Sequence, residues 1–278
     1  MLALLTLTVG MTMAKSDAPD GTRTRKVAVC QTFCIDSDLD GNLARVEQAL
    51  KKAVAGGAEV ACFAEAVDLG WVNPAAHEAS SPIPGPTSDR IAALAKKYGV
   101  LVCIGLTEKD GDKLYDSVIL VDKTGEILAK HRKVNILAEL MTPAYTCGDE
   151  GGVKVTETSI GRVGLLICAD VFKESLVKAA GDQRPDLMLI PYGWAAAKDQ
   201  WPEHGKSLAS WVSSVARRVK CPVVGTNLVG AISSGPWKGR TYGGQSVVAD
   251  GTGKVLGVLS DRDADVRVFE LEIGSKAG

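Results

Sequence analysis

The sequence has few of the residues and motifs that usually hold a metal ion. It contains only three histidines, and none of them lies in an HExxH-like arrangement. Its seven cysteines include no CxxC pair, and Cys30 with Cys34 has no second ligand pair at the spacing of a zinc site. Any chemistry that this chain performs is therefore expected to run without a metal ion.

The chain also lacks an excess of charge of either sign. Its 32 basic and 33 acidic residues leave a formal net charge of −1, so there is no basic surplus to hold a phosphate backbone. With 278 residues and an odd number of cysteines, the chain is not a small disulfide scaffold. The composition is that of an ordinary globular protein, and neither nucleic acids nor anionic membranes are expected partners.

No long hydrophobic run is present either, although the first fourteen residues are apolar or small and carry no charge. That stretch is too short to span a membrane, which takes about 20 residues. It resembles the apolar core of a secretory signal with Ala14 at a possible cleavage point, but no positive residue precedes it. Residues 1–25 are interpreted as a signal-like or disordered segment, and the location stays open between the cytoplasm and export.

No linker rich in proline or serine, charge block or low-complexity segment divides the remainder, which predicts one domain over residues 26–278. Short β-rich runs alternate there with helical patterns. Helices are expected from Asp40 to Gly56, from the end of a loop at residues 80–90 through Tyr98, from about Phe172 onward, and from Glu203 to Val219. Strands are expected at residues 26–33, 58–66, 100–108, 117–122, 126–131, 162–168, 186–192 and 221–227, with three more near 245–249, 254–259 and 266–272.

A hairpin interrupts this alternation. Two of the expected strands, 117–122 and 126–131, are joined by a short turn around Gly125 with no helix between them, so antiparallel pairs enter the sheet. Two mixed sheets, each covered on its outer side by helices, would account for the many buried strands and the few long helices. The predicted fold class is α/β, as a four-layer α-β-β-α sandwich.

Cys168 ends an apolar run, GLLIC, at a point where a strand gives way to a helix. Free backbone N–H groups gather at such a junction and favour a thiolate, as a nucleophile requires. Free cysteines are nevertheless among the most buried residues, and six others in this chain need no catalytic role. The local pattern leaves a core thiol and a nucleophile both open.

Glu65 and Lys133 lie near the ends of two other expected strands. Glu65 interrupts the apolar run CFAEA, and a carboxylate buried there without a partner would be costly, so it needs a partner or a task. Lys133 follows the hairpin in HRKVNIL, where the alternative is a solvated basic cluster. Each signal is weak by itself.

Taken together and in this order, Glu65, Lys133 and Cys168 resemble the catalytic triad of the nitrilase superfamily of carbon-nitrogen hydrolases. The matching motifs are FAE at 63–65, HRKVNIL at 131–137 and LLICAD at 165–170. The resemblance extends over nearly everything from Lys26 to Ile273. It implies hydrolysis of a small amide or carbamoyl compound through a thioester on Cys168, with no cofactor, by a homodimer or larger homo-oligomer.

The resemblance also implies a role for each residue. Glu65 would take the thiol proton and return it to the departing amine, while Lys133 and the backbone N–H of Ala169 would stabilise the oxyanion. Glu139 is the candidate for a second glutamate that positions the substrate, with an exposed loop acid as the alternative. Trp194 would wall the pocket unless it is a core aromatic.

Two departures from the family pattern bear on the substrate. Nitrile-cleaving members typically have a tryptophan and a glutamate directly after the nucleophile, where this chain has Ala169 and Asp170. This favours amides over nitriles. Carbamoyl amino-acid hydrolases usually have arginines shortly after the cysteine, where this chain offers only Lys173.

Three other functions remain as alternatives. An N-acyltransferase would pass the acyl group of the same thioester to an amine, and a binding protein would keep the fold without the chemistry. A nucleotide-binding enzyme is disfavoured because no GxGxxG motif follows the first expected strand.

Overall fold

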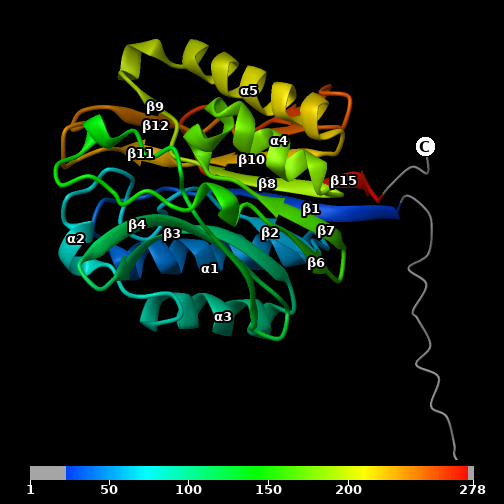
Figure 1. The fold of residues 1–278 in the computed structure, drawn as a ribbon, viewed down its shortest axis with the longest axis horizontal. Coiled ribbons are helices and arrows are strands. Elements are labelled where there is room, and N and C mark those ends of the chain that lie inside the picture. The colour runs from blue at the N-terminus through cyan, green and yellow to red at the C-terminus, as the bar shows by residue number, and fades with distance from the viewer. Residues whose placement is uncertain (1–22, 275–278) are drawn as a thin grey trace, which may run out of the picture.

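Two mixed sheets pack face to face, with helices on the outer side of each (Figure 1). The computed structural model describes residues 23–274, so the possible signal and its cleavage point at Ala14 lie outside the described residues. In Figure 1 one sheet is covered by α1 (Leu39–Ala55) and α3 (Pro86–Tyr98) and the other by α4 (Glu174–Asp182) and α5 (Glu203–Val219). The predicted α-β-β-α sandwich is confirmed.

The first sheet has six strands in the order β15-β1-β2-β3-β4-β5. They are β1 (Arg23–Gln31), β2 (Val60–Cys62), β3 (Leu101–Asp110), β4 (Lys113–Val121), β5 (Ile127–Arg132) and β15 (Asp265–Ile273). β2 runs parallel to β1 and β3, and the other neighbours are antiparallel. The predicted hairpin is the β4–β5 pair.

The second sheet also has six strands, in the order β14-β13-β10-β8-β7-β6. They are β6 (Val155–Thr158), β7 (Gly161–Leu165), β8 (Leu187–Tyr192), β10 (Val223–Asn227), β13 (Val247–Ala249) and β14 (Val255–Val258). A small third sheet consists of β9 (Ala195–Ala196), β11 (Val229–Ala231) and β12 (Thr241–Gly243). Because β8 is parallel to β7 and β10, their carboxyl ends meet at one edge of the second sheet.

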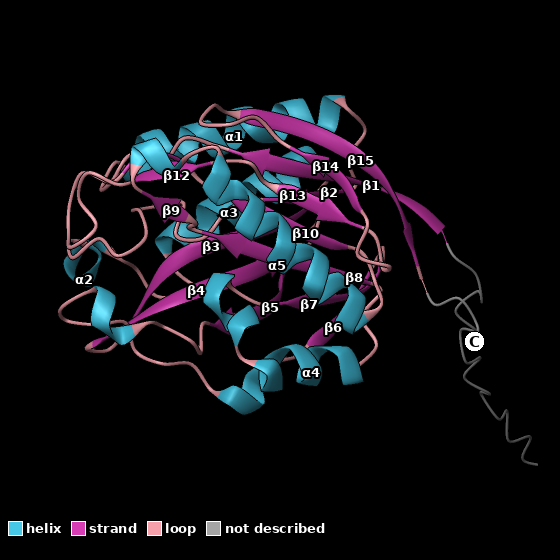
Figure 2. Ribbon diagram, turned by 90° about the horizontal axis from the view of Figure 1, so that it is seen from above, coloured by secondary structure: helices cyan, strands magenta, loops and turns pink. Residues whose placement is uncertain are grey.

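Alternation along the strands and apolar stripes on the helices explain the layers. In β4, Val118 and Leu120 face the second sheet, whereas Ile119 and Val121 face the helices of the first. In α1, Leu43, Val46 and Leu50 recur at helical spacing and are buried against that helical side. Figure 2 shows α5 crossing over the strands of the second sheet, where Leu208, Val212 and Val215 enter the core.

The side chain of Asp38 begins α1 by accepting a hydrogen bond from the backbone N–H of Gly41 at 3.1 Å. The helix therefore begins close to the predicted polar start at Asp40. A short helix, α2 (Ala76–Ala79), lies in the segment between β2 and α3. No helix within residues 23–274 has both the length and the apolar character needed to cross a membrane.

Several boundaries differ from the prediction, and β6, β9, β11 and β12 were not predicted. β1 begins at Arg23, inside the segment 1–25 that was set apart, because Arg23 pairs with Ile273 in β15. β2 ends at Cys62 rather than near 66 because regular pairing stops there. Ala64 and Val67 still bond Gly105 of β3, but the N–H of Glu65 bonds the carbonyl of Tyr192 in β8 at 3.4 Å. The helix expected from Phe172 begins at Glu174, after a 3-10 helix, η3 (Cys168–Phe172).

Candidate active site

The three residues singled out in the sequence meet in the buried space between the sheets. Glu65 follows β2, Lys133 directly follows β5, and Cys168 follows β7, and their exposed fractions are 0%, 1% and 4%. Nζ of Lys133 donates a hydrogen bond to Oε1 of Glu65, and the backbone N–H of Gly193, just after β8, donates to Oε2. Both oxygens of the Glu65 carboxylate are therefore held.

Cys168 adopts a backbone conformation that cysteine rarely takes. Its φ is 41°, in the left-handed region, which costs a residue other than glycine about 1–3 kcal/mol. Burial raises the pKa of the thiol well above its usual value, and the negative charge of Glu65 raises it further, while Lys133 and the N–H of Gly193 oppose the rise. The resting thiol is therefore protonated and requires a base. Glu65 and Lys133 both lie close enough for their charges to act on the thiol.

Lys133 keeps its charge in this buried position. Burial alone would lower its pKa, but the negative charges of Glu65 and Asp116 outweigh that effect and hold the pKa well above its ordinary value. Nζ lies 3.2 Å from Oδ2 of Asp116 and 5.4 Å from the centre of the Trp71 ring. A fixed cation next to Cys168 can stabilise negative charge that develops there.

Asp170 fastens the Cys168 segment to the Lys133 segment. Its Oδ1 accepts hydrogen bonds from the backbone N–H groups of Val134 at 2.9 Å and Asn135 at 2.8 Å. Its Oδ2 lies 2.8 Å from Nε2 of His131 and accepts from the N–H of Ile167 at 3.1 Å. One carboxylate thus spans the segments that carry the candidate oxyanion lysine and the candidate nucleophile.

The supporting residues lie in different places. Ala169 is buried in η3 directly after Cys168, so its backbone N–H lies next to the candidate nucleophile in the chain. Trp194 is partly buried, with its ring centre 5.9 Å from that of Phe172 and stacked on His204 at 5.5 Å. Glu139 lies on an exposed 3-10 turn, η1 (Ala138–Leu140), and is not brought into the cluster.

Asp116, Asp170 and Gly193 complete the cluster, and the sequence reasoning assigned none of them a role there. Asp116 carried the same signal as Glu65, a carboxylate inside an apolar strand in LYDSVIL. For Asp170 the sequence offers its place in LLICAD and the departure from the nitrile pattern, and neither indicates a connection to the Lys133 segment. The N–H of Gly193 carries no side-chain signal, since any residue other than proline supplies one.

Gly105 packs directly against the backbone of Glu65, so replacing Gly105 tests whether catalysis depends on the position of Glu65. A Cβ added at Gly105 would lie 2.6 Å from Cα of Glu65 and 2.7 Å from the carbonyl oxygen of Ala64. We expect Gly105→Ala to displace Glu65, to destabilise the fold by about 1–3 kcal/mol and to lower turnover. Urea unfolding and ammonia release measure the two effects.

The matched control is Gly151→Ala, because its added Cβ would meet no atom closer than 3.5 Å and the residue is exposed. This variant should retain both stability and turnover. An unaltered Gly105→Ala enzyme would contradict the proposed tight contact.

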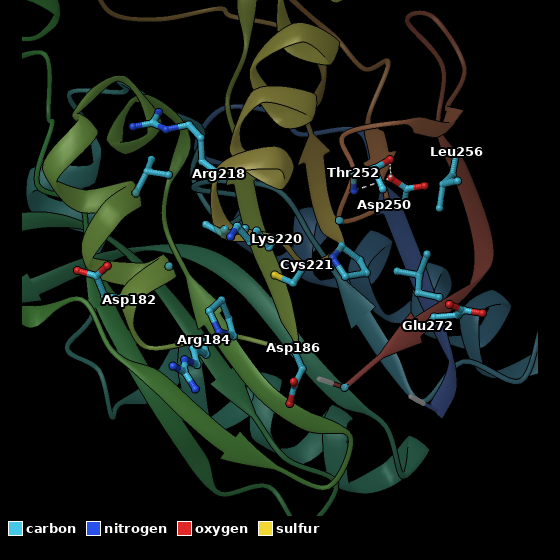
Figure 3. Close-up of a pocket in the computed structure, with 18 of the residues that line it drawn as sticks. Asp182, Arg184, Asp186, Arg218, Lys220, Cys221, Asp250, Thr252, Leu256 and Glu272 are labelled. Atoms are coloured by element: carbon cyan, nitrogen blue, oxygen red, sulfur yellow. Dashed lines mark hydrogen bonds between the residues drawn. The ribbon is translucent and has the colours of Figure 1, made fainter. Parts of the chain in front are cut away.

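A cavity of about 1350 Å³ lies at the other edge of the second sheet (Figure 3). Asp186 and Cys221 line it, and they lie just before the amino ends of β8 and β10. The candidate catalytic residues gather instead at the carboxyl ends of the parallel strands. Arg218, at its wall, pairs with Glu174 at 3.7 Å. This cavity is thus separate from the Glu65, Lys133 and Cys168 cluster, which does not line it.

Comparison with known proteins points to one family. The family model described as carbon-nitrogen hydrolase matches residues 26–275. A bifunctional nitrilase/nitrile hydratase from Nicotiana tabacum is 31% identical over 180 residues, which cover 57% of this chain and 51% of that protein. The chain thus spans about half the length of this relative.

Two further similarities extend over most of the chain. An N-carbamoylputrescine amidase from Solanum lycopersicum is 25% identical over 267 residues, covering 89% of this chain and 86% of that one. A variant amidase from Nesterenkonia sp. AN1, solved with the acetamide moiety of fluoroacetamide added covalently at its active-site cysteine, matches with a TM-score of 0.77. That match has 21% sequence identity and covers 93% of this chain and 94% of the other.

Proposed function

Because the chain belongs to the carbon-nitrogen hydrolase family, we propose that it hydrolyses a small amide or carbamoyl compound through a thioester on Cys168. The observation that carries the proposal is the buried hydrogen bond between Lys133 and the Glu65 carboxylate, close enough to Cys168 for both charges to act on its thiol. A nucleophile, a base and a fixed cation then share one site. The match over residues 26–275 also supports one domain for this part of the chain.

The first half of the reaction forms the thioester. The raised pKa of the Cys168 thiol means that Glu65 takes the proton as sulfur attacks the amide carbon. Lys133 and the backbone N–H of Ala169 stabilise the oxyanion of the tetrahedral intermediate. Glu65 then passes the proton to the departing nitrogen, which leaves as ammonia or an amine.

The second half releases the acid. Glu65, again a carboxylate, takes a proton from a water molecule that attacks the thioester carbon. The same cation and N–H stabilise the second oxyanion, and the proton returns to sulfur when the C–S bond breaks. Because both halves use the same groups, no further side chain is needed for proton balance.

The pair Ala169-Asp170 supports amides as the substrate class. In this chain Ala169 presents only a methyl group beside Cys168, and Asp170 is turned into the protein by its bonds to His131 and to the Lys133 segment. Asp170 is therefore not available to a substrate. The amidase name of the Nesterenkonia neighbour agrees with this reading, whereas the tobacco relative is named for nitriles, so nitriles belong in the test.

The test is a substrate panel in which each acyl group is offered in two forms, with carbamoyl compounds as a separate class. Acetyl and butyryl groups are presented as the primary amide and the corresponding nitrile, together with N-carbamoyl amines, and ammonia release is followed. We expect turnover of amides or carbamoyl compounds at least about 100-fold above that of nitriles. Hydroxylamine added to the assay should capture the thioester as a hydroxamate.

Two results would overturn the proposal. Turnover confined to nitriles would contradict the substrate class. Product formed only in the presence of an amine acceptor, with no free acid, would identify an acyltransferase that uses the same thioester.

A further inference from the structure

We propose that Asp116 is a positioning residue of this site, which holds Lys133 in place and shares one proton with Glu65. The inference rests on the proposed function and adds a second carboxyl to it. Asp116 lies on β4, its exposed fraction is 0%, and on its strand it faces the second sheet together with Val118 and Leu120.

Asp116 contacts Lys133 through both its backbone and its side chain. The carbonyl of Asp116 accepts a hydrogen bond from the N–H of Lys133 at 2.8 Å, and Oδ2 accepts from Nζ at 3.2 Å. Lys133 immediately follows the last residue of β5, which pairs with β4. The long lysine side chain is thus held at its origin and at its tip by the same residue, and Glu65 holds the tip from the other side.

The second carboxyl oxygen of Asp116, Oδ1, indicates that the carboxyl shares a proton. Oδ1 is buried and has no hydrogen-bond partner among the described residues, a costly state for a carboxylate oxygen. The carboxylates of Glu65 and Asp116 both accept hydrogen bonds from Nζ of Lys133, so they lie beside the same buried ammonium group. Two carboxylates this close cannot both be ionised at low cost, and a single proton between them supplies the missing bond.

The charge balance of the cluster leads to the same result. With one shared proton, Glu65 and Asp116 together carry one negative charge and Lys133 one positive charge, so the three side chains sum to zero. When Glu65 takes the thiol proton, both Glu65 and Asp116 are protonated and the negative charge moves to the oxyanion beside Lys133. The sum over Glu65, Asp116, Lys133 and the oxyanion stays at zero, whereas an ionised Asp116 would place a second negative charge near the oxyanion.

Burial raises the pKa of Asp116 well above its usual range, and the charge of Glu65 raises it further, although Lys133 opposes the rise. Tyr145, whose buried hydroxyl has no hydrogen-bond partner among the described residues, is close enough for the charge of Asp116 to raise its pKa as well. The groups that face Asp116 therefore include one acid, one base and one neutral hydroxyl, and only Lys133 favours the ionised form.

Three variants test this assignment. Asp116→Asn keeps the shape and, like a protonated carboxyl, offers both a donor and an acceptor, so we expect kcat within about threefold of the parent enzyme. Asp116→Ala removes the support of Lys133 and should lower kcat about 100-fold with KM changed less than threefold. Ser117→Ala is the matched control, because Ser117 is buried on the same strand but its hydroxyl donates to Glu108 at 2.5 Å on the opposite face of the sheet. This variant should lower Tm and leave kcat unchanged.

A spectroscopic measurement makes the test independent of turnover. The infrared difference spectrum of the parent protein minus Asp116→Asn at pH 7 should contain the carbonyl band of a protonated carboxyl. Absence of this band, or a kcat for Asp116→Asn as low as for Asp116→Ala, would overturn the shared proton. Parent-like kcat in Asp116→Ala would overturn the positioning role. A protein that shows the band but hydrolyses no compound of the panel would contradict the proposed function alone.

Discussion

Replacement of Cys168 with alanine is expected to lower ammonia release by about 10⁴-fold or more while the protein remains folded. The thiol is the only group in the cluster that can bond covalently to the substrate carbon, and neither Glu65 nor Lys133 replaces it. Residual turnover would reflect binding and oxyanion stabilisation without a nucleophile. Initial rates on the best amide of the panel measure the change.

Cys221 provides the matched control for this loss. Its exposed fraction equals that of Cys168, 4%, but it begins the segment that leads into β10 and lines the separate cavity. Cys221→Ala removes the same sulfur from an equally buried place and should retain turnover, with a stability loss of about 1 kcal/mol for the vacated volume. Equal turnover in Cys168→Ala and Cys221→Ala would rule out the thioester.

Replacement of Asp170 with alanine is expected to reduce both stability and activity. The change leaves the backbone N–H groups of Ile167, Val134 and Asn135 buried without their acceptor, and His131 loses its partner. Loss of a buried hydrogen-bonded carboxylate of this kind costs about 3–5 kcal/mol, measured as the free energy of unfolding in urea. Turnover should fall as well, because Cys168 and Lys133 are no longer fastened to each other.

The acid dependence of stability provides a second measure of Asp170. Burial alone would raise its pKa, but the bond to His131 and the backbone N–H of Asn135 outweigh burial and hold the pKa below its ordinary value. A carboxyl with a lowered pKa stabilises the fold above its unfolded pKa of about 3.9, and this contribution is lost as the pH falls through the folded pKa. Asp170→Ala should therefore lose less stability than the parent protein below about pH 4.

Asp250 is the control for Asp170, since it also accepts backbone hydrogen bonds, from Thr252 at 2.9 Å and Lys254 at 3.1 Å, but in an exposed turn. Asp250→Ala should cost about 1 kcal/mol and leave turnover unchanged. If both aspartate variants lost equal stability and retained activity, Asp170 would be an ordinary turn residue and not the connection between the two segments.

The sequence alone determined the layers and the residue types of the chemistry. Strand and helix patterns are local, because they depend on alternation and on helical spacing within one segment. The β4–β5 hairpin was predictable for the same reason, since its turn lies between its two strands. Glu65 attracted attention because a carboxylate in an apolar strand requires a partner, and the motif order then connected it with Lys133 and Cys168.

The tertiary structure alone decided which polar groups meet. Strand order depends on pairing between distant segments, such as Arg23 with Ile273, and no local pattern encodes it. The same long-range packing ends β2 early and brings Glu65 to Gly193, just after β8 of the second sheet. It also places Asp116 beside Lys133 and leaves Glu139 on an exposed turn, because both outcomes depend on how distant segments pack and on no pattern within one segment.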